Sequence, residues 1–191
     1  MLTGTMLVNG LNKDKDRREL DYYPTPPQVT AALLEYLNKL YELSTMTCIE
    51  PACGTGEMVK ILEKYFLRVQ SSDIILECYG VGDTDYLTTP YPGSENTALI
   101  TNPPFKHSEA FIRKAIAEKH FITAMLLKSQ YWHSRKRYSL FMDTNPAYIL
   151  PLTWRPDFYF SKKGSSPTME VIWTVWVNAP HDNCIYHPLI R

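Results

Sequence analysis

Apolar and polar positions along this chain alternate between helical and strand spacing. After Pro27, apolar side chains recur every three or four residues, which predicts an amphipathic helix over roughly 27–43. Shorter runs of both kinds follow. The predicted strands are 47–50, 68–73, 98–101, 121–127, 147–152 and 169–178, and the later predicted helices are 56–66, 108–119 and about 134–143. This alternation predicts an α/β fold, with an open, mostly parallel sheet and helices on both faces.

Two segments refine the predicted sheet. Residues 121–127 are almost continuously apolar, as expected for a parallel strand that is covered on both faces. Only seven residues separate Asp73 from a possible edge strand near Val81. A parallel helical crossover needs more residues than that. The edge strand is therefore predicted to be rudimentary or absent.

Length and composition fit one domain with a sizeable core. The chain has 191 residues, of which 45% are hydrophobic and 13% aromatic. We assign residues 1–20 to a polar N-terminal arm and residues 21–191 to a single domain. Lysine plus arginine equals aspartate plus glutamate, at 20 each. A nucleic-acid partner would therefore have to use local basic patches rather than a global positive field.

The cysteines and the N-terminus further narrow the class of protein to which this chain can belong. Cys48, Cys53, Cys78 and Cys184 form no CxxC pair and no Cys/His ligand spacing, so neither a metal site nor a disulfide framework is predicted. The N-terminus lacks the apolar region of a signal peptide, and no apolar run approaches the length of a membrane span. We therefore expect a cytoplasmic protein with reduced thiols and no membrane partner.

The segment Asn102-Pro103-Pro104-Phe105 suits chemistry on an exocyclic amine. Such an amine is a poor nucleophile, because its lone pair is delocalised into the ring. The Asn102 carbonyl and a proline carbonyl could accept its two N–H bonds, and the prolines hold these acceptors at little entropic cost. Phe105 offers a face for a base that has left its stack. The alternative is a simple strand-ending turn, which Asn-Pro often makes.

A second candidate motif runs from Glu50 to Glu57, where an apolar strand enters a loop of small residues. Its glycines allow close approach of a ligand to the backbone at the carboxyl end of a strand. It matches neither GxxxxGK[ST] nor GxGxxG, which disfavours a phosphate loop and a dinucleotide site. The charge of Glu50 suits the amino group or sulfonium of S-adenosylmethionine. A purely structural glycine turn is the alternative.

Carboxylates further along the chain could complete a nucleoside site. Asp73 ends the second predicted strand, where a carboxylate can accept both ribose hydroxyls, and Ile74 could pack on an adenine face. Alone, Asp73 would more often be a cap or turn residue. Asp83 and Asp85 are alternative acceptors for the adenine amino group. Asp85 is favoured, because Tyr86 and a leucine follow it.

These motifs, in this order, resemble the class I S-adenosylmethionine-dependent amino-methyltransferases, and among them the small phage-type DNA N6-adenine methyltransferases. The resemblance covers about residues 21–178. It implies a Rossmann-like fold with an antiparallel last strand, and methylation of DNA adenine, as in restriction-modification. Members that read a defined sequence carry a target-recognition region, and none is visible here, so short or relaxed specificity is expected.

The resemblance also assigns site residues. The residues implied to bind the cofactor are Tyr23, Thr25, Pro26, Glu50, Pro51, Ala52, Cys53, Gly54, Gly56, Asp73, Ile74, Asp85, Tyr86 and Asn102. The catalytic residues it implies are Asn102, Pro103, Pro104 and Phe105. Residues 155–158 and 163–167 are similar to the loop before the family's last strand.

Basic and aromatic residues suggest where a nucleic-acid substrate would lie. Residues 128–137 interleave the two types, which can pair phosphates and stack bases, although a solvated helix start would look much the same. A second patch lies in the Gly/Ser/Pro-rich loop near residue 163. Besides Phe105, the candidate substrate contacts are Lys128, Arg135, Arg137, Trp154, Phe158 and Lys163.

Three alternatives remain open at this point. The substrate could be an RNA base amine or a protein glutamine amide, because an Asn-Pro-Pro-aromatic turn suits planar amines and amides generally. The chain could instead be a non-catalytic module that binds the cofactor. A homo-oligomer or a separate specificity partner is also compatible with the sequence.

Overall fold

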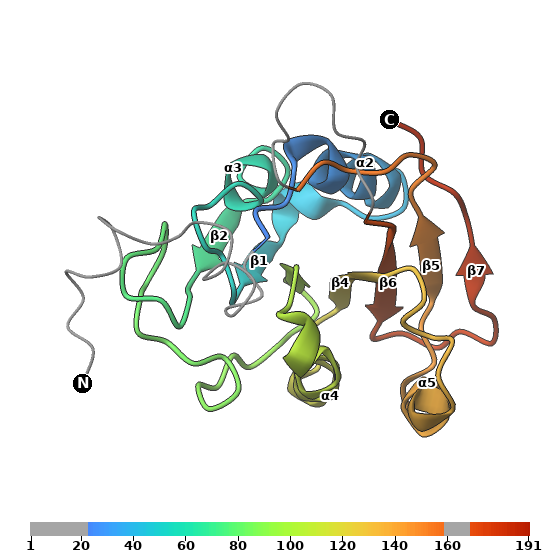
Figure 1. The fold of residues 1–191 in the computed structure, drawn as a ribbon. Coiled ribbons are helices and arrows are strands. Elements are labelled where there is room, and N and C mark those ends of the chain that lie inside the picture. Colours follow the sequence, from blue (N-terminus) through green and yellow to red (C-terminus); the bar gives the residue numbers. More distant parts are fainter. Residues whose placement is uncertain (1–22, 159–168) are drawn as a thin grey trace.

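The computed structural model describes residues 23–158 and 169–191. Within these residues, seven strands form one sheet in the order β2-β1-β3-β4-β6-β5-β7 (Figure 1). The strands are β1 Thr47–Glu50, β2 Arg68–Ser71, β3 Thr97–Thr101, β4 Ile122–Lys128, β5 Tyr148–Pro151, β6 Val171–Val177 and β7 Ile185–Tyr186. The first four strands are parallel, and β6 is antiparallel to both β4 and β5. The predicted mostly parallel sheet is confirmed, whereas the short β7 was not predicted.

Helices cover both faces of the sheet, as predicted. In Figure 1, α2 and α3 lie on one face and α4 and α5 on the other. The helices are α2 Pro27–Leu37, α3 Val59–Leu62, α4 Ser108–Glu118 and α5 Tyr138–Thr144, with 3-10 turns η2 Leu43–Thr45, η3 Phe105–His107 and η4 Arg135–Arg137. The predicted polar arm at residues 1–20 lies outside the described residues.

Three predicted helices are shorter than expected. The first ends at Leu37 rather than near residue 43, because the chain turns after Asn38 and leaves Leu40 about half exposed. The second reduces to α3, flanked by hydrogen-bonded turns. The segment at 134–143 splits into η4 and α5. In each case an apolar stripe marked the buried face but not the point where the chain must turn toward the next strand.

The core consists of two layers, one on each face of the sheet. In β4, Ala124 and Leu126 belong to the layer under α2 and α3, and Met125 and Leu127 belong to the layer against α4. Side chains of a strand alternate between faces, so a continuous apolar run is what a strand covered on both sides requires. On β6, the Trp173 Nε1 donates to the Val29 carbonyl over 3.0 Å and ties the sheet to α2.

The short crossover after β2 behaves as predicted. Residues beyond β2 return to the sheet only as a single bridge between Ser72 and Val81. A hydrogen bond from the Asp73 N–H to the Val81 carbonyl (3.0 Å) closes this return. The edge strand is therefore rudimentary. Asp73 and the residues that follow it lie beyond the carboxyl end of β2.

Candidate functional site

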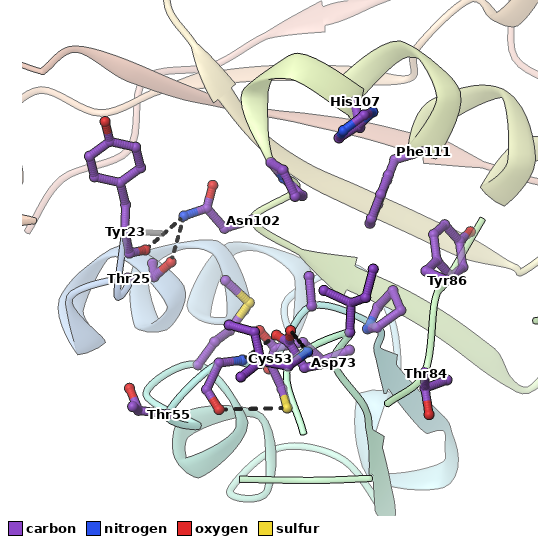
Figure 2. A pocket seen from close by; sticks show the side chains of 18 of the residues that line it. Tyr23, Thr25, Cys53, Thr55, Asp73, Thr84, Tyr86, Asn102, His107 and Phe111 are labelled. Atoms are coloured by element: carbon purple, nitrogen blue, oxygen red, sulfur yellow. Dashed lines mark hydrogen bonds between the residues drawn. The ribbon is translucent and has the colours of Figure 1, made fainter. Parts of the chain in front are cut away.

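A cavity of about 400 Å³ opens at the carboxyl ends of β1, β2 and β3. Figure 2 shows Asn102 on one side of it, Asp73 and Cys53 below, and Tyr86 and Phe111 at the far end. Thirteen of the predicted site residues line it: Tyr23, Thr25, Glu50, Pro51, Ala52, Cys53, Gly54, Asp73, Ile74, Asp85, Tyr86, Asn102 and Pro104. Residues that are far apart in the sequence thus share one cavity, as expected where parallel strands end at the same edge.

The Asn102 side chain is held in one orientation by the segment before α2. Its Nδ2 donates to the Tyr23 carbonyl (3.2 Å) and to the Thr25 Oγ1 (3.1 Å). A backbone carbonyl can only accept, so the amide nitrogen must face Tyr23. The Asn102 Oδ1 therefore points away from Tyr23 and is presented as an acceptor (Figure 2).

Glu50 is a buried carboxyl group in the cavity wall. Its side chain is 2% exposed, and among the described residues its Oε2 has no hydrogen-bond partner. Burial, and secondarily the nearby charge of Asp73, raise the pKa of Glu50 well above its usual range. Ionisation of a buried carboxyl group is costly, so a cationic ligand in the cavity would stabilise the charged form of Glu50.

Asp73 connects β2 to the glycine loop. Its Oδ2 accepts from the Gly54 N–H over 2.7 Å, and its Oδ1 accepts from the Ile75 N–H over 3.0 Å. Each carboxylate oxygen has capacity for a second hydrogen bond. Asp73 is 7% exposed and lines the cavity, so these remaining positions are available to a ligand there.

The glycine loop bends tightly around this carboxylate. Gly54 and Gly56 both have positive φ, of 49° and 81°. A Cβ on Gly56 would lie 2.2 Å from the Tyr79 ring, so Gly56 serves packing behind the loop rather than the cavity itself. Burial raises the pKa of the Cys53 thiol to about 12, which keeps it protonated and suits a small filler rather than a nucleophile.

The far end of the cavity is formed by residues 84–87 and by Phe111 of α4. Asp85 lines the cavity, and its Oδ1 accepts from the Leu87 N–H over 2.9 Å. Asp83 does not line it and has a left-handed φ of 53°. Of the two predicted alternatives, Asp85 is therefore the one that the fold places at the cavity.

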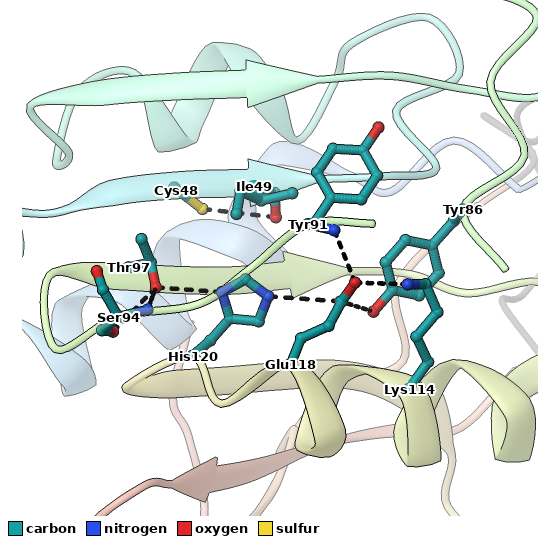
Figure 3. A network of polar contacts seen from close by, with 9 residues as sticks. All are labelled: Cys48, Ile49, Tyr86, Tyr91, Ser94, Thr97, Lys114, Glu118 and His120. Carbon is teal, nitrogen blue, oxygen red and sulfur yellow. Dashed lines mark hydrogen bonds and ion pairs between the residues drawn. The ribbon is translucent and has the colours of Figure 1, made fainter. Parts of the chain in front are cut away.

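A partly buried polar network fixes this end of the cavity (Figure 3). The Tyr86 hydroxyl donates to the Glu118 Oε2 (2.9 Å), and the Tyr91 N–H donates to the Glu118 Oε1 (2.7 Å). Lys114 pairs with Glu118 over 2.5 Å, and its ammonium lies 4.9 Å from the Tyr86 ring centre. One carboxylate thus holds both ends of residues 86–91 against α4.

Phe105 lies beside the cavity rather than in its lining. Its ring centre is 5.5 Å from that of Tyr23, and the Nζ of Lys128, the exposed last residue of β4, lies 4.3 Å from the Phe105 ring centre. Phe158 is 2% exposed and packs edge-on against Tyr23. The turn thus places the Phe105 ring next to the Tyr23 ring and the Lys128 ammonium.

The other predicted residues that the structure describes are not among those that line the cavity. Pro26 caps α2, and Pro103 is buried in the turn. Trp154 is half-buried against the core. Arg135 and Arg137 lie near α5, where the Arg137 guanidinium stacks 3.9 Å over the Tyr131 ring. Lys163 is outside the described residues. In the predicted 128–137 patch, Tyr131 is buried and Trp132 is partly buried, and the exposed cations are Lys128, Arg135 and Lys136.

Some lining residues were not predicted. Phe111 was assigned to the core by its helical spacing, and the same periodicity cannot tell a cavity wall from a packed face. Lys106 and His107 directly follow the Asn-Pro-Pro-Phe turn, so their position in sequence could have indicated them. The remaining unpredicted lining residues are Pro24, Thr55, Glu57, Met58, Ile75, Thr84 and Leu87.

Comparisons with solved structures identify the fold as that of the class I methyltransferases. A type I restriction-modification methyltransferase subunit from Streptococcus thermophilus superposes with a TM-score of 0.64 at 11% identity, covering 87% of this chain and 47% of that one. A protein assigned as an RNA methyltransferase from Pyrococcus horikoshii gives a TM-score of 0.65 at 15% identity, covering 91% and 96%. A dimethyladenosine transferase from Plasmodium falciparum gives 0.59 at 16%, covering 82% and 63%.

This chain spans about half the length of the restriction-modification subunits it matches. No protein-family model and no curated protein sequence matches it. In the described parts of the chain, no helix is long and apolar enough to cross a bilayer.

Proposed function

We propose that this protein transfers a methyl group from S-adenosylmethionine to the N6 amine of adenine in DNA, with short or relaxed sequence preference. The observation that carries the proposal is the fixed Asn102 amide, whose acceptor oxygen is presented at a cavity that also contains Glu50 and Asp73. The solved structures with this fold include a restriction-modification methyltransferase subunit and a dimethyladenosine transferase, which supports methyl transfer to an adenine amine.

The residues of the cavity fit this cofactor. Glu50 supplies a buried acceptor without a partner, which suits the cationic methionine end. Asp73 has hydrogen-bonding capacity left for the ribose hydroxyls, and Ile74, Asp85 and Phe111 would surround the adenine. When bound, S-adenosylmethionine supplies a methyl group made electrophilic by its sulfonium.

The chain's own part in the reaction is to hold and orient the amine. The Asn102 Oδ1 and the Pro103 carbonyl would accept the two N–H bonds, turn the nitrogen lone pair toward the methyl group and place it in line. Positioning of this kind supplies much of the rate of a bimolecular step. Phe105 would stack the base, and the proton leaves after transfer, so no strong general base is needed.

DNA is favoured over RNA or protein by the residues before α2. Asp21 to Pro27 resembles the N-terminal cofactor motif of the DNA enzymes, and the structure holds Tyr23 and Thr25 of that segment against Asn102. The likeness to a dimethyladenosine transferase and to a protein assigned as an RNA methyltransferase supports an RNA adenine as the second candidate. The described residues contain no separate unit for target recognition, which is why relaxed specificity is proposed.

Tritiated S-adenosylmethionine tests the proposal directly. Unmethylated DNA, RNA and a protein mixture are each incubated with the protein and the labelled cofactor. We expect label in DNA. Label confined to RNA or protein would contradict the DNA assignment, and saturable cofactor binding in a calorimeter without any transfer would leave only a binding module.

Replacing Glu118 with Ala should loosen the adenine end of the cavity. We expect unfolding free energy to fall by about 1–3 kcal/mol, because the Tyr86 hydroxyl and the Tyr91 N–H lose their acceptor. Cofactor affinity should fall several-fold in calorimetry. Glu109→Ala is the matched control, since Glu109 lies on the same helix in an exposed pair with Arg113 and such pairs contribute little. Unchanged cofactor affinity in a folded Glu118→Ala protein would refute this role.

A further inference from the structure

A second hollow, of about 620 Å³, lies between η4 and α5. Its lining combines aromatic rings with guanidinium groups and contains no carboxylate: Trp132, Ser134, Arg135, Arg137, Tyr138 and Phe141. Trp132 forms a fixed wall, because its Nε1 donates to the Thr174 Oγ1 (3.1 Å) and its ring packs edge-on against Phe141 at 5.2 Å. These contacts hold one wall of the hollow in place.

Two of its residues are not used by the fold. Tyr138 is 69% exposed, which is unusual for a large aromatic ring beside a hollow. Arg135 is exposed, and within the described residues no carboxylate lies within ion-pair distance of it. An exposed ring next to an unpaired guanidinium is the combination that stacks a base and pairs its phosphate.

The hollow lies near the catalytic turn along the chain. Lys128, whose ammonium lies 4.3 Å from the Phe105 ring centre, is four residues before Trp132. Four residues span at most about 14 Å. A strand that places one base on Phe105 would therefore need several nucleotides to reach this hollow, since stacked nucleotides are spaced by about 3.4 Å.

We propose that the hollow holds a second nucleotide of the DNA substrate, on the same strand as the target adenine. Its base would stack on Tyr138 beside Trp132, and Arg135 would pair its phosphate. This inference rests on the proposed function and extends it. The described residues contain no separate recognition unit, and the hollow would supply a contact to DNA outside the target base. Positive charge without acidic residues in the lining favours a polyanion as the occupant.

Single substitutions at the rim test the proposal without disturbing Trp132. Tyr138→Ala and Arg135→Ala are compared with Tyr186→Ala and Arg68→Ala, which remove a 70% exposed tyrosine on β7 and an exposed arginine on the opposite edge strand β2. The probe is a fluorescein-labelled DNA duplex with unmethylated adenines. We expect each rim variant to bind it about tenfold more weakly. Arg135→Ala should also reduce the slope of the logarithm of the DNA-binding constant against the logarithm of the salt concentration by about 1, as expected for the loss of one phosphate contact.

Cofactor affinity and transfer kinetics complete the test. The rim variants should keep wild-type cofactor affinity and raise the KM for DNA with little change in kcat, and both control variants should match the wild type. If the wild type methylates DNA while the rim variants bind and methylate it equally well, the second nucleotide site is refuted and the proposed function stands. If the same-sequence RNA is bound and methylated in place of DNA, or if the wild type transfers no label to DNA, the DNA site is refuted together with the proposed function.

Discussion

Replacing Asn102 with Ala is expected to lower the rate of methyl transfer at least a hundredfold while leaving cofactor affinity within about twofold. The Asn102 Oδ1 is the acceptor that would localise the lone pair of the amine, and loss of alignment at a reacting centre costs a factor of this size. Cofactor binding should survive, because Asp73 lies across the cavity from Asn102 (Figure 2) and Glu50 also lines the cavity. Single-turnover transfer and calorimetry measure the two effects separately.

The contacts of the Asn102 amide make a sharper variant available. In Asn102→Asp, the carboxylate keeps an acceptor for the amine but places an oxygen against the Tyr23 carbonyl, where the amide donated. We expect this variant also to lose activity, and to be less stable at neutral pH than at low pH. Asn96→Ala, in the exposed loop before β3, is the control. Full activity in Asn102→Ala would exclude the mechanism.

Replacing Glu50 with Gln is expected to stabilise the protein without cofactor and to weaken cofactor binding at least tenfold. The folded-state pKa of Glu50 is raised, so the unfolded chain releases its proton first as pH rises. The contribution of Glu50 to the free energy of unfolding is therefore fully present below about pH 4, and it is lost as pH rises through the folded-state pKa. The neutral amide avoids this loss.

Thermal melts as a function of pH test the sign. Glu50→Gln should melt higher than the wild type at pH 8, by about 2–4 °C for each kcal/mol recovered, and the gap should close toward pH 4. Cofactor affinity of the wild type should rise with pH, because the ionised form is the one that pairs with a cationic ligand. Glu63→Gln, at an exposed position after α3, should show neither effect. A wild type that melts higher than Glu50→Gln at pH 8 would contradict the account.

The sequence predicted the layered sheet and most of the cavity because both depend on local patterns. A run such as 121–127 is apolar throughout only when helices cover both faces, and residues at the ends of parallel strands must meet at one edge. Glu50 and Asp73 end predicted strands and Asn102 follows one, so their convergence followed from the topology alone. The crossover after Asp73 was similarly constrained by its length.

Other features depend on contacts that no local pattern encodes. The hydrogen bonds from Asn102 to Tyr23 and Thr25 join residues nearly 80 positions apart. Glu118 lies at a helix end, where sequence alone indicates a solvated position, yet it is mostly buried and accepts a hydrogen bond from a tyrosine of another segment. Phe158 and Arg137 had the residue types of a substrate contact but are held by Tyr23 and Tyr131. In these cases the residue type indicated a possible substrate contact, whereas packing determined whether the side chain was available to make it.

The modified nucleoside itself tests the central claim most directly. DNA and RNA from cells that produce the wild type or Asn102→Ala, in a host without adenine methylation, are digested to nucleosides and measured by mass spectrometry. The account predicts N6-methyladenine in the DNA of cells with the wild type and none above background with Asn102→Ala. DNA without N6-methyladenine in cells that contain folded, cofactor-binding wild-type protein would contradict it.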